Sequence, residues 1–454
     1  RGCHPASIRR YIAPVTQPRG IPPAWVVLAA GVATALHLGK LPPAVPVLQA
    51  ELGMSLVQAG FLLALIQLAG MCLGLVIGVG ADGLGLRRSM VLGLSILSAA
   101  GVASGFTHQV GGLLALRAVE GLGFLLATVP APGLLRRIVP AGQVTRVLGV
   151  WGAYVPFGTA LGMLVGPRVL AGSSWPLWWW LVAAGTAVMA VAVRTRVPAD
   201  PVGSGAAGAV PWRERARVTL RARGPWLGAL TFGVYAAQWM AVIGFLPTLY
   251  VASGWVGALG AALTATVAAA NVIGNVAAGL LLHRGWRPGL VLGLGFAGQA
   301  SGAVLAFAAL TEDQPVVRFA GAMLFSTVGG LIPGSIFGLA PSLAPSEPTI
   351  STTVGWIQQW SSAGQVAGPP VVAWVATALG GWQWTWAVSL TLCLAGLMLA
   401  TRLDKVGEAA TLRETSTVFA ALIGWLVLGE KVGPVRTGLM ALIAGGAVMI
   451  EAFG

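Results

Sequence analysis

Charge is what this sequence has least of. Only 9% of its 454 residues are charged, whereas 56% are hydrophobic. Average soluble domains carry about 25% charged residues. A chain with so little charge cannot cover a water-exposed surface, so we predict an all-α polytopic membrane protein whose main partner is the lipid bilayer.

Cysteine, histidine and acidic residues are also scarce, with totals of 3, 4 and 13. Cys72 and Cys393 lie inside apolar runs, and an odd total predicts no disulfide framework. The scattered histidines form no cluster with acids, so we expect no metal, no cofactor and no enzyme. The sequence also has no Walker A motif, which excludes ATP as the direct energy source.

Basic residues are the exception, and they give a net charge of +14. They lie in short connectors between apolar runs rather than along one amphipathic face, so they predict membrane orientation and not nucleic-acid binding.

One glycine-rich stretch, from Gly78 to Arg88, satisfies the G-x-G-x-x-G pattern of dinucleotide folds. That pattern requires a short strand before it and an amphipathic helix after it. Long apolar runs flank it here instead, so we interpret it as a turn between two membrane helices.

Apolar runs of about twenty residues, enough to cross the hydrocarbon core, recur along the chain. They cover 24–40, 57–78, 89–107, 111–131, 147–167, 175–193, 226–250, 258–282, 289–309, 318–340, 352–378 and 383–401. We therefore predict twelve transmembrane helices in two six-helix bundles, 24–193 and 226–403, joined by a basic linker at 194–225.

Basic residues also indicate the sidedness. The arginines at 87–88, 136–146, 194–223 and 284–287 lie on alternate connectors, which predicts that these connectors are cytoplasmic. The segment 1–23 and both termini would then be cytoplasmic, in a protein of the cytoplasmic (inner) membrane. That segment has no apolar core for a cleavable signal and begins with Arg, so we expect the true start to lie upstream.

The two halves repeat a pattern of small residues. Glycines at four-residue spacing followed by proline occur from Gly158 to Pro167 in the fifth span and from Gly364 to Pro370 in the eleventh. The turn at 279–287 occupies the place of a second copy of the Gly78–Arg88 stretch, with His283 where Asp82 would be. Duplicated halves with substrate bound between them are a known transporter plan.

These motifs resemble those of the major facilitator superfamily. Gly78, Asp82, Gly85 and Arg87 match its Gly-x-x-x-Asp-x-x-Gly-Arg-Arg/Lys turn, with Leu86 at the place of an arginine. The stretches 116–123 and 158–167 match its fourth-helix and fifth-helix motifs. The resemblance covers 20–403 and implies a secondary transporter; the run 39–44 and the tryptophan-rich seventh span loosely resemble the cyanate-permease-like group.

The tail differs from the rest of the chain. Residues 404–454 resemble the last helical hairpin of the drug/metabolite (EamA-type) transporter superfamily, including its Leu428-Gly429-Glu430 turn. The remainder of that fold is missing. We therefore expect an extra two-helix hairpin left by a gene fusion or a frameshift, rather than a second working transporter.

Arg117 and Glu120 are the first candidates for chemistry. A charge inside a span costs about 2.5–3.5 kcal/mol on insertion scales, and their i, i+3 spacing puts both on one helix face. We hypothesise that Glu120 takes up and releases a coupling proton while Arg117 holds its charged form or meets an anionic substrate. The alternative is a structural ion pair.

Other polar residues inside spans are candidates for substrate binding. His37 and Lys40 lie one turn apart in the first span, where they would attract an anion unless Lys40 only extends to the interface. The remaining candidates are Tyr154, Tyr235, Gln238, Trp239, Asn271, Gln358 and Gln359, with Asn275 and Gln365 as further contributors. The alternative for each is an interhelical hydrogen bond.

The turn itself is a candidate gate. Asp82, Arg87 and Arg88 lie at helix ends, where they can make contacts that exist in one access state and break in the other. The alternative is that the charges only anchor topology. Taken together, the residues predict a monomeric carrier for a small solute, with an anion as one candidate, coupled to a proton or another ion. A drug/metabolite efflux carrier and a non-transporting sensor are the alternatives.

Overall fold

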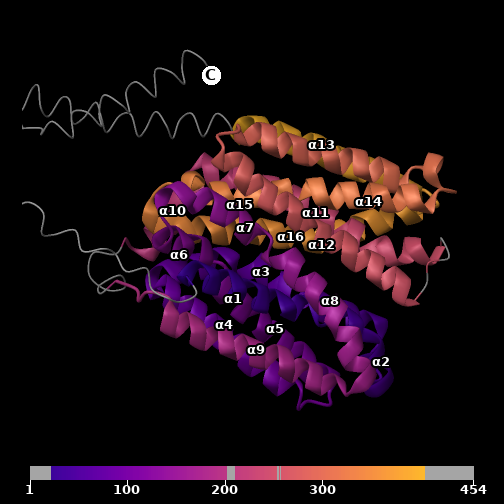
Figure 1. Ribbon diagram of the computed structural model, residues 1–454, viewed down its shortest axis with the longest axis horizontal. Coiled ribbons are helices and arrows are strands. Elements are labelled where there is room, and N and C mark those ends of the chain that lie inside the picture. Colours follow the sequence, from indigo (N-terminus) through magenta and orange to yellow (C-terminus); the bar gives the residue numbers. More distant parts are fainter. Residues whose placement is uncertain (1–21, 202–209, 253–254, 256, 404–454) are drawn as a thin grey trace, which may run out of the picture.

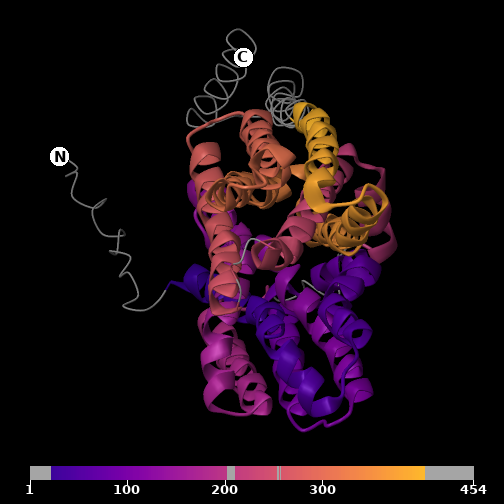
Figure 2. The same ribbon diagram turned by 90° about the vertical axis from the view of Figure 1, so that its right-hand side faces the viewer.

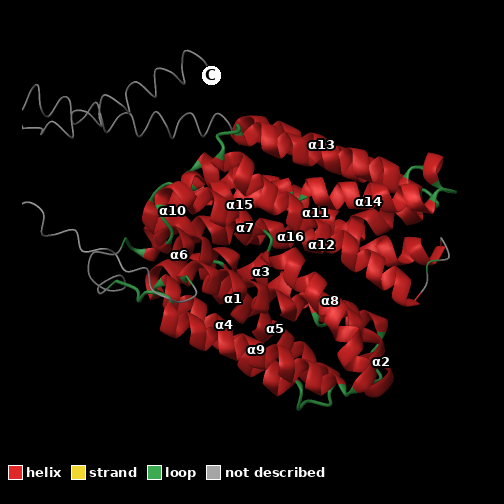
Figure 3. Ribbon diagram, in the orientation of Figure 1, coloured by secondary structure: helices red, strands yellow, loops and turns green. Residues whose placement is uncertain are grey.

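The computed structural model describes residues 22–201, 210–252, 255 and 257–403, and within these ranges the elements are helices without any strand (Figure 3). The all-helical fold predicted from the sequence is confirmed. The hairpin predicted at 404–454 lies outside the described residues, as do residues 1–21.

The helices of the first half of the chain follow the predicted spans closely. Some spans are divided into one long helix and one or two short ones. Its elements are α1 Pro23–Gly39, η1 Pro42–Ala44, α2 Val45–Leu52, α3 Leu56–Leu84, α4 Leu86–Ser104, α5 Val110–Thr128, α6 Ala131–Ile138, η2 Ala141–Gln143, α7 Val144–Gly152, α8 Tyr154–Gly172 and α9 Trp175–Arg196.

The second half of the chain begins with a helix inside the predicted linker. Its elements are α10 Trp212–Arg221, α11 Arg223–Ala252, α12 Gly257–His283, α13 Pro288–Phe307, η3 Ala309–Thr311, α14 Pro315–Gly329, α15 Leu331–Leu343, η4 Glu347–Thr349, α16 Ile350–Ala378, η5 Trp382–Trp384 and a last helix over 385–403.

Eleven helical stretches of the described chain are long and apolar enough to cross a membrane, which makes this a multi-pass membrane protein. The eleven do not include α16, although its 29 residues extend for roughly 43 Å at the usual helical rise. Its many glutamine, serine and threonine side chains lower its hydropathy. This polarity is explained by its position, because α16 packs against α3 and α11 in the centre of the molecule.

The turn between α3 and α4 depends on one glycine. Gly85 adopts a φ of +102°, which side-chain-bearing residues rarely adopt. A Cβ on Gly85 would also lie 2.7 Å from Oδ2 of Asp200. Any residue with a side chain would therefore be strained at this reversal, which brings the start of α4 against Asp200.

The two halves lie one above the other, with the indigo-to-magenta helices of the first half below the orange-to-yellow helices of the second (Figures 1 and 2). They meet along two seams, α3 with α16 and α7 with α12. Small residues allow the backbones to approach: a Cβ on Gly74 would lie 2.6 Å from the carbonyl oxygen of Gly355, and Gly149 packs directly on Gly279.

Candidate functional site

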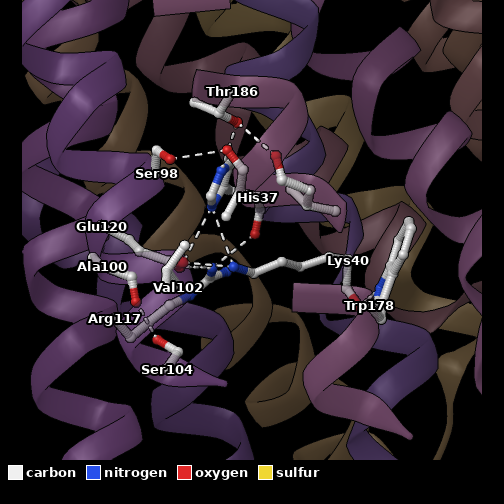
Figure 4. Close-up of polar contacts among 12 residues, drawn as sticks. His37, Lys40, Ser98, Ala100, Val102, Ser104, Arg117, Glu120, Trp178 and Thr186 are labelled. Carbon is white, nitrogen blue, oxygen red and sulfur yellow. Dashed lines mark hydrogen bonds and ion pairs between the residues drawn. The ribbon is translucent and has the colours of Figure 1, made fainter. Parts of the chain in front are cut away.

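Four charged or titratable side chains converge inside the first half, and we call them the charged cluster: His37, Lys40, Arg117 and Glu120 (Figure 4). His37 and Lys40 come from the end of α1, and the other two from one face of α5. None of the four is more than 3% exposed. The cluster joins two pairs that the sequence analysis treated separately.

Glu120 is the centre of this cluster. Its Oε1 accepts a hydrogen bond from Lys40 Nζ at 2.5 Å and lies 3.1 Å from His37 Nδ1. Its Oε2 accepts from Arg117 Nη1 at 2.7 Å. Arg117 also donates to the backbone carbonyls of His37 and Leu62, at 2.7 and 3.1 Å. The guanidinium thus ties α5 to α1 and α3.

The tautomer of His37 follows from its second ring nitrogen. Thr186 donates its hydroxyl to the carbonyl of Val182 at 2.9 Å, so its oxygen accepts from His37 Nε2 at 3.0 Å. A neutral His37 then has a bare Nδ1 that accepts from Lys40 Nζ, 3.2 Å away. A second proton on Nδ1 would instead be donated to Glu120.

The charges of this cluster do not balance. Lys40 and Arg117 contribute two positive charges against the single carboxylate of Glu120, and no other acid among the described residues pairs with them. Part of the excess is offset by an aromatic ring, because the Lys40 ammonium lies 4.9 Å from the ring centroid of Trp179. Adding a proton to His37, or removing one from Lys40, therefore changes the net charge of a cluster that is buried from water.

A second site, the central cavity, lies where the two halves meet. Its walls come from α7, α8, α11, α12, α15 and α16. Aromatic and amide side chains dominate its described lining, and none of the lining residues is charged. The aromatic members are Tyr154, Phe232, Tyr235, Trp239 and Phe337; the polar ones are Asn271, Gln358, Ser361 and Gln365.

Most of the predicted substrate-binding residues line this cavity, but five lie elsewhere. Asn275 lies behind the wall and donates to the backbone carbonyl and the side-chain oxygen of Asn271, at 3.0 and 2.9 Å. His37 and Lys40 belong to the charged cluster. Gln238 accepts a hydrogen bond from Cys393 within the second half, at 3.3 Å. Gln359 accepts one from the backbone N–H of Leu75 at 2.9 Å, which ties α16 to α3.

Aromatic side chains connect the charged cluster to the central cavity. Phe124 lies one helical turn after Glu120 on α5, and its ring centroid is 6.4 Å from that of Tyr154. Tyr154 lines the cavity and stacks on Trp151 at 4.4 Å. Both sit against Gly31 of α1, where a Cβ would lie 3.3 Å from Cβ of Tyr154. The two sites are therefore neighbours through packed rings.

At one end of the bundle Asp82 links the two halves. Its carboxylate accepts hydrogen bonds from the backbone N–H groups of Ser351 and Thr352, at 3.3 and 2.9 Å, and from the Thr352 hydroxyl at 2.8 Å. These are the first N–H groups of α16, so the acid also faces the positive end of the helix dipole. We call this end of the molecule the Asp82 end.

Two further contacts close the Asp82 end. Arg136 of α6 lies 3.5 Å from Glu347 of η4, an exposed ion pair between the halves. Gly78 packs against the start of α16, where a Cβ would lie 2.5 Å from the carbonyl oxygen of Ser351. The second half thus rests on the Gly78–Arg88 stretch.

Arg87 and Arg88 contact a residue of the linker, Asp200, whereas Asp82 contacts the second half. Their backbone N–H groups donate to the carboxylate of Asp200, at 3.1 and 3.0 Å, and Arg137 Nη1 donates to it at 2.9 Å. Burial opposes the charge of Asp200, but these three hydrogen bonds and the Arg137 charge hold its pKa below the ordinary range. Asp200 therefore caps α4 from within the linker.

Asp200 and the aromatic residues Phe232 and Phe337 were missed by the sequence analysis. Asp200 lies among the arginines of the linker, a signal that was available. Phe232 lies three residues before Tyr235, on the same face of α11, which was also readable. Phe337 lies in an apolar run in which Ser335 is the nearest polar residue, and nothing in that run marks the ring as part of a site.

Two helical halves that meet around a cavity lined from both of them are an arrangement known from secondary transporters. The chain belongs to the Major Facilitator Superfamily, whose family model matches residues 26–349.

Solved structures and curated relatives agree with this family. The human organic anion transporter MFSD10 (TETRAN) aligns over 85% of this chain and 100% of its own, with a TM-score of 0.71 at 17% identity. The transporter FucP in its outward conformation aligns over 84% and 99%, with a TM-score of 0.68 at 14% identity. At these identities the likeness shows the fold alone.

Two curated relatives match over shorter stretches. The tetracenomycin C resistance and export protein of Streptomyces glaucescens is 28% identical over 36% of this chain and 30% of its own length. The methyl viologen resistance protein SmvA of Salmonella typhimurium is 31% identical over 32% of this chain and 28% of its own. The chain thus matches less than a third of either relative. These matches do not support the cyanate-permease-like or EamA-type resemblances.

Proposed function

We propose that this protein is a monomeric, proton-coupled secondary carrier in which two six-helix halves alternate access to the central cavity, with α16 as one of twelve spanning helices. The observation that carries this proposal is the position of the cavity. It is lined from both halves, and Asp82 holds those halves together at one end by capping α16. A cavity between two bodies with a breakable latch is what alternating access requires.

The Asp82 end is the cytoplasmic end in this proposal. Arg87, Arg88, Arg136 and Arg137 gather there, as the positive-inside rule expects for a cytoplasmic (inner) membrane protein. The contacts of Asp82 and Glu347 with the opposite half then close the cytoplasmic side.

The charged cluster is the proposed coupling centre. Arg117 and Lys40 both stabilise the charged form of Glu120, so protonation of Glu120 weakens two short contacts, at 2.7 and 2.5 Å, and displaces the donor from the oxygen that takes the proton. Because the cluster carries excess positive charge, loss of one proton from the Lys40–His37 pair also relieves it. Either change of charge can affect the cavity mechanically, because Phe124 of the same helix packs against Tyr154 of the cavity wall.

Export is the second candidate for the direction of transport. It is supported by the resemblance to an export protein and to a resistance protein. A drug/metabolite-type carrier formed by the tail is less favoured, since the cavity, the latch and the charged cluster all lie within residues 22–403.

Reconstitution into liposomes that contain a pH-sensitive dye tests the proposal. A panel of anionic, cationic and neutral aromatic compounds, with methyl viologen among them, is added with and without a pH gradient. We expect at least one compound to move protons as it is transported, and Glu120→Gln to abolish that proton movement. Glu51→Gln, at an exposed acid of α2, is the matched control.

Two results would contradict the proposal. One is transport whose rate is the same with and without the gradient in both the wild type and Glu120→Gln, which would leave a carrier without proton coupling. The other is the absence of transport for every compound, which would favour a membrane sensor.

A further inference from the structure

The described lining of the central cavity combines several aromatic rings with a complete lack of charge. Tyr154 of the first half meets Phe337 of the second at a centroid distance of 6.5 Å. Phe337 then meets Phe232 at 5.5 Å, and Phe232 stacks on Tyr235 at 5.9 Å. The rings thus form one continuous wall that crosses from one half to the other.

From this wall we infer that the cavity binds an uncharged, flat aromatic solute that carries a hydrogen-bond acceptor. The inference rests on the proposed carrier function and specifies its substrate class. Flat rings stack favourably against aromatic side chains, and a solute in contact with Tyr154 and Phe337 touches both halves at once. Binding of such a solute can therefore affect both halves, which must move relative to each other during transport.

An ionic solute has no partner in this cavity. Burying an ionised group is costly unless an opposite charge and hydrogen bonds accompany it. The nearby cations, Lys40 and Arg117, are bound to Glu120 and lie inside the first half rather than on the cavity wall. An anion would thus lose its hydration without gaining an ion pair.

A cationic solute is disfavoured for a related reason. No carboxylate is found among the described lining residues. Ring faces attract cations, but without a carboxylate this attraction alone would have to offset the loss of the cation's hydration. An uncharged ring loses little hydration on entry and needs no oppositely charged partner.

The free hydrogen-bonding groups of the lining indicate the polarity of the solute. Tyr235 and Asn271 are bonded to each other at 3.0 Å, and Gln365 donates to Ser361 at 3.3 Å. By contrast, the indole N–H of Trp239 is buried in the wall and has no hydrogen-bond partner among the described residues. An indole N–H only donates, so it matches a carbonyl or ring-nitrogen acceptor.

Three probes with the same naphthalene ring and point of attachment separate the alternatives: naphthamide, naphthoate and naphthylmethylammonium. Each is titrated against the purified full-length chain in detergent, with equilibrium dialysis as the binding measurement. We expect naphthamide to bind at least about tenfold more tightly than either ion. Tighter or equal binding of naphthoate, tighter or equal binding of the ammonium compound, or no binding of any probe would overturn the inference.

Trp239→Phe tests the role of the indole. It keeps an aromatic ring and removes the N–H, so loss of one neutral hydrogen bond should weaken naphthamide binding about threefold to tenfold. Trp286→Phe, at a tryptophan 43% exposed and remote from the cavity lining, should leave it unchanged. Equal affinity of the wild type and the Trp239→Phe variant for naphthamide would show that the indole N–H does not bind the solute.

Binding in detergent requires no gradient, so this result is independent of the transport assay. Naphthamide binding without any transport would leave the substrate class standing and contradict the carrier. Proton-coupled transport of naphthoate without naphthamide binding would support the carrier and contradict the substrate class.

Discussion

Replacing Glu120 by glutamine should be one of the most damaging single changes inside the first half. Among the residues that the structure describes, this carboxylate is the only acid within reach of Lys40, Arg117 and His37, at 2.5, 2.7 and 3.1 Å. Glutamine fills a similar volume but carries no charge. Two buried cations would then remain without a counter-ion.

The size of the effect follows from this geometry. Removing one partner of a buried ion pair costs about 3–5 kcal/mol, because the other charge is left uncompensated. Lys40→Met alone should cost less than about 1.5 kcal/mol, since Arg117 and Glu120 remain a balanced pair. Adding Lys40→Met to Glu120→Gln should restore about 1–3 kcal/mol, the usual range of coupling between contacting residues.

Unfolding by sodium dodecyl sulfate in mixed micelles measures these free energies, with helical circular dichroism as the signal. Glu51→Gln, at an exposed position, should change stability by no more than about 0.5 kcal/mol. The reasoning would be refuted if Glu120→Gln matched that control. It would also be refuted if Lys40→Met made the Glu120→Gln variant still less stable.

The remaining predictions concern the Asp82 end and the tail. Asp82→Asn should lower turnover with little change in substrate affinity, because it weakens the cap on α16; transport kinetics check this, with Asp313→Asn as the exposed control. Gly85→Ala should cost about 1–3 kcal/mol because of its φ of +102° and the nearby carboxylate, whereas Gly80→Ala, with open space at its Cβ, should be neutral or stabilising in the same unfolding assay. The pKa of Asp200 is lowered in the folded state, so its contribution to stability should be full above the unfolded pKa of about 3.9 and lost as pH falls below it; unfolding of the wild type and Asp200→Asn should therefore converge in acid, and a constant difference would argue against that pairing. Deletion of 406–454 should leave proteoliposome transport intact, and loss of activity in a well-folded deletion variant would assign the tail a role.

The positions of the helices could be predicted because a helix must be apolar for about twenty residues to cross a bilayer. The run at 352–378 shows that two features besides hydropathy help to identify a spanning helix: the six-plus-six count of the runs and the glycine–proline pattern repeated in the fifth and eleventh of them. It was predicted as a span, and α16 occupies 350–378, although it is too polar to be among the eleven apolar spanning stretches.

The partners of side chains were harder to predict because they depend on how each helix is rotated. Gln358 and Gln359 are adjacent in sequence, yet successive residues of a helix point about 100° apart. One lines the central cavity and the other bonds to α3. Similarly, the sequence pairs Glu120 with Arg117 and Lys40 with His37 by their spacing, whereas the packing of α1 on α5 makes Lys40 and Glu120 partners of each other.

Spin-label distances across both ends of the bundle test alternating access most directly. In a chain whose native cysteines are replaced by serine, one label pair joins the exposed positions Gln143 and Arg284 at the Asp82 end, and another joins Gln109 and Glu312 at the opposite end. When pH is lowered or Asp82→Asn is introduced, we predict that the first distance increases while the second decreases. Distances that stay fixed at both ends under every condition, or that increase and decrease together, would contradict alternating access around the central cavity.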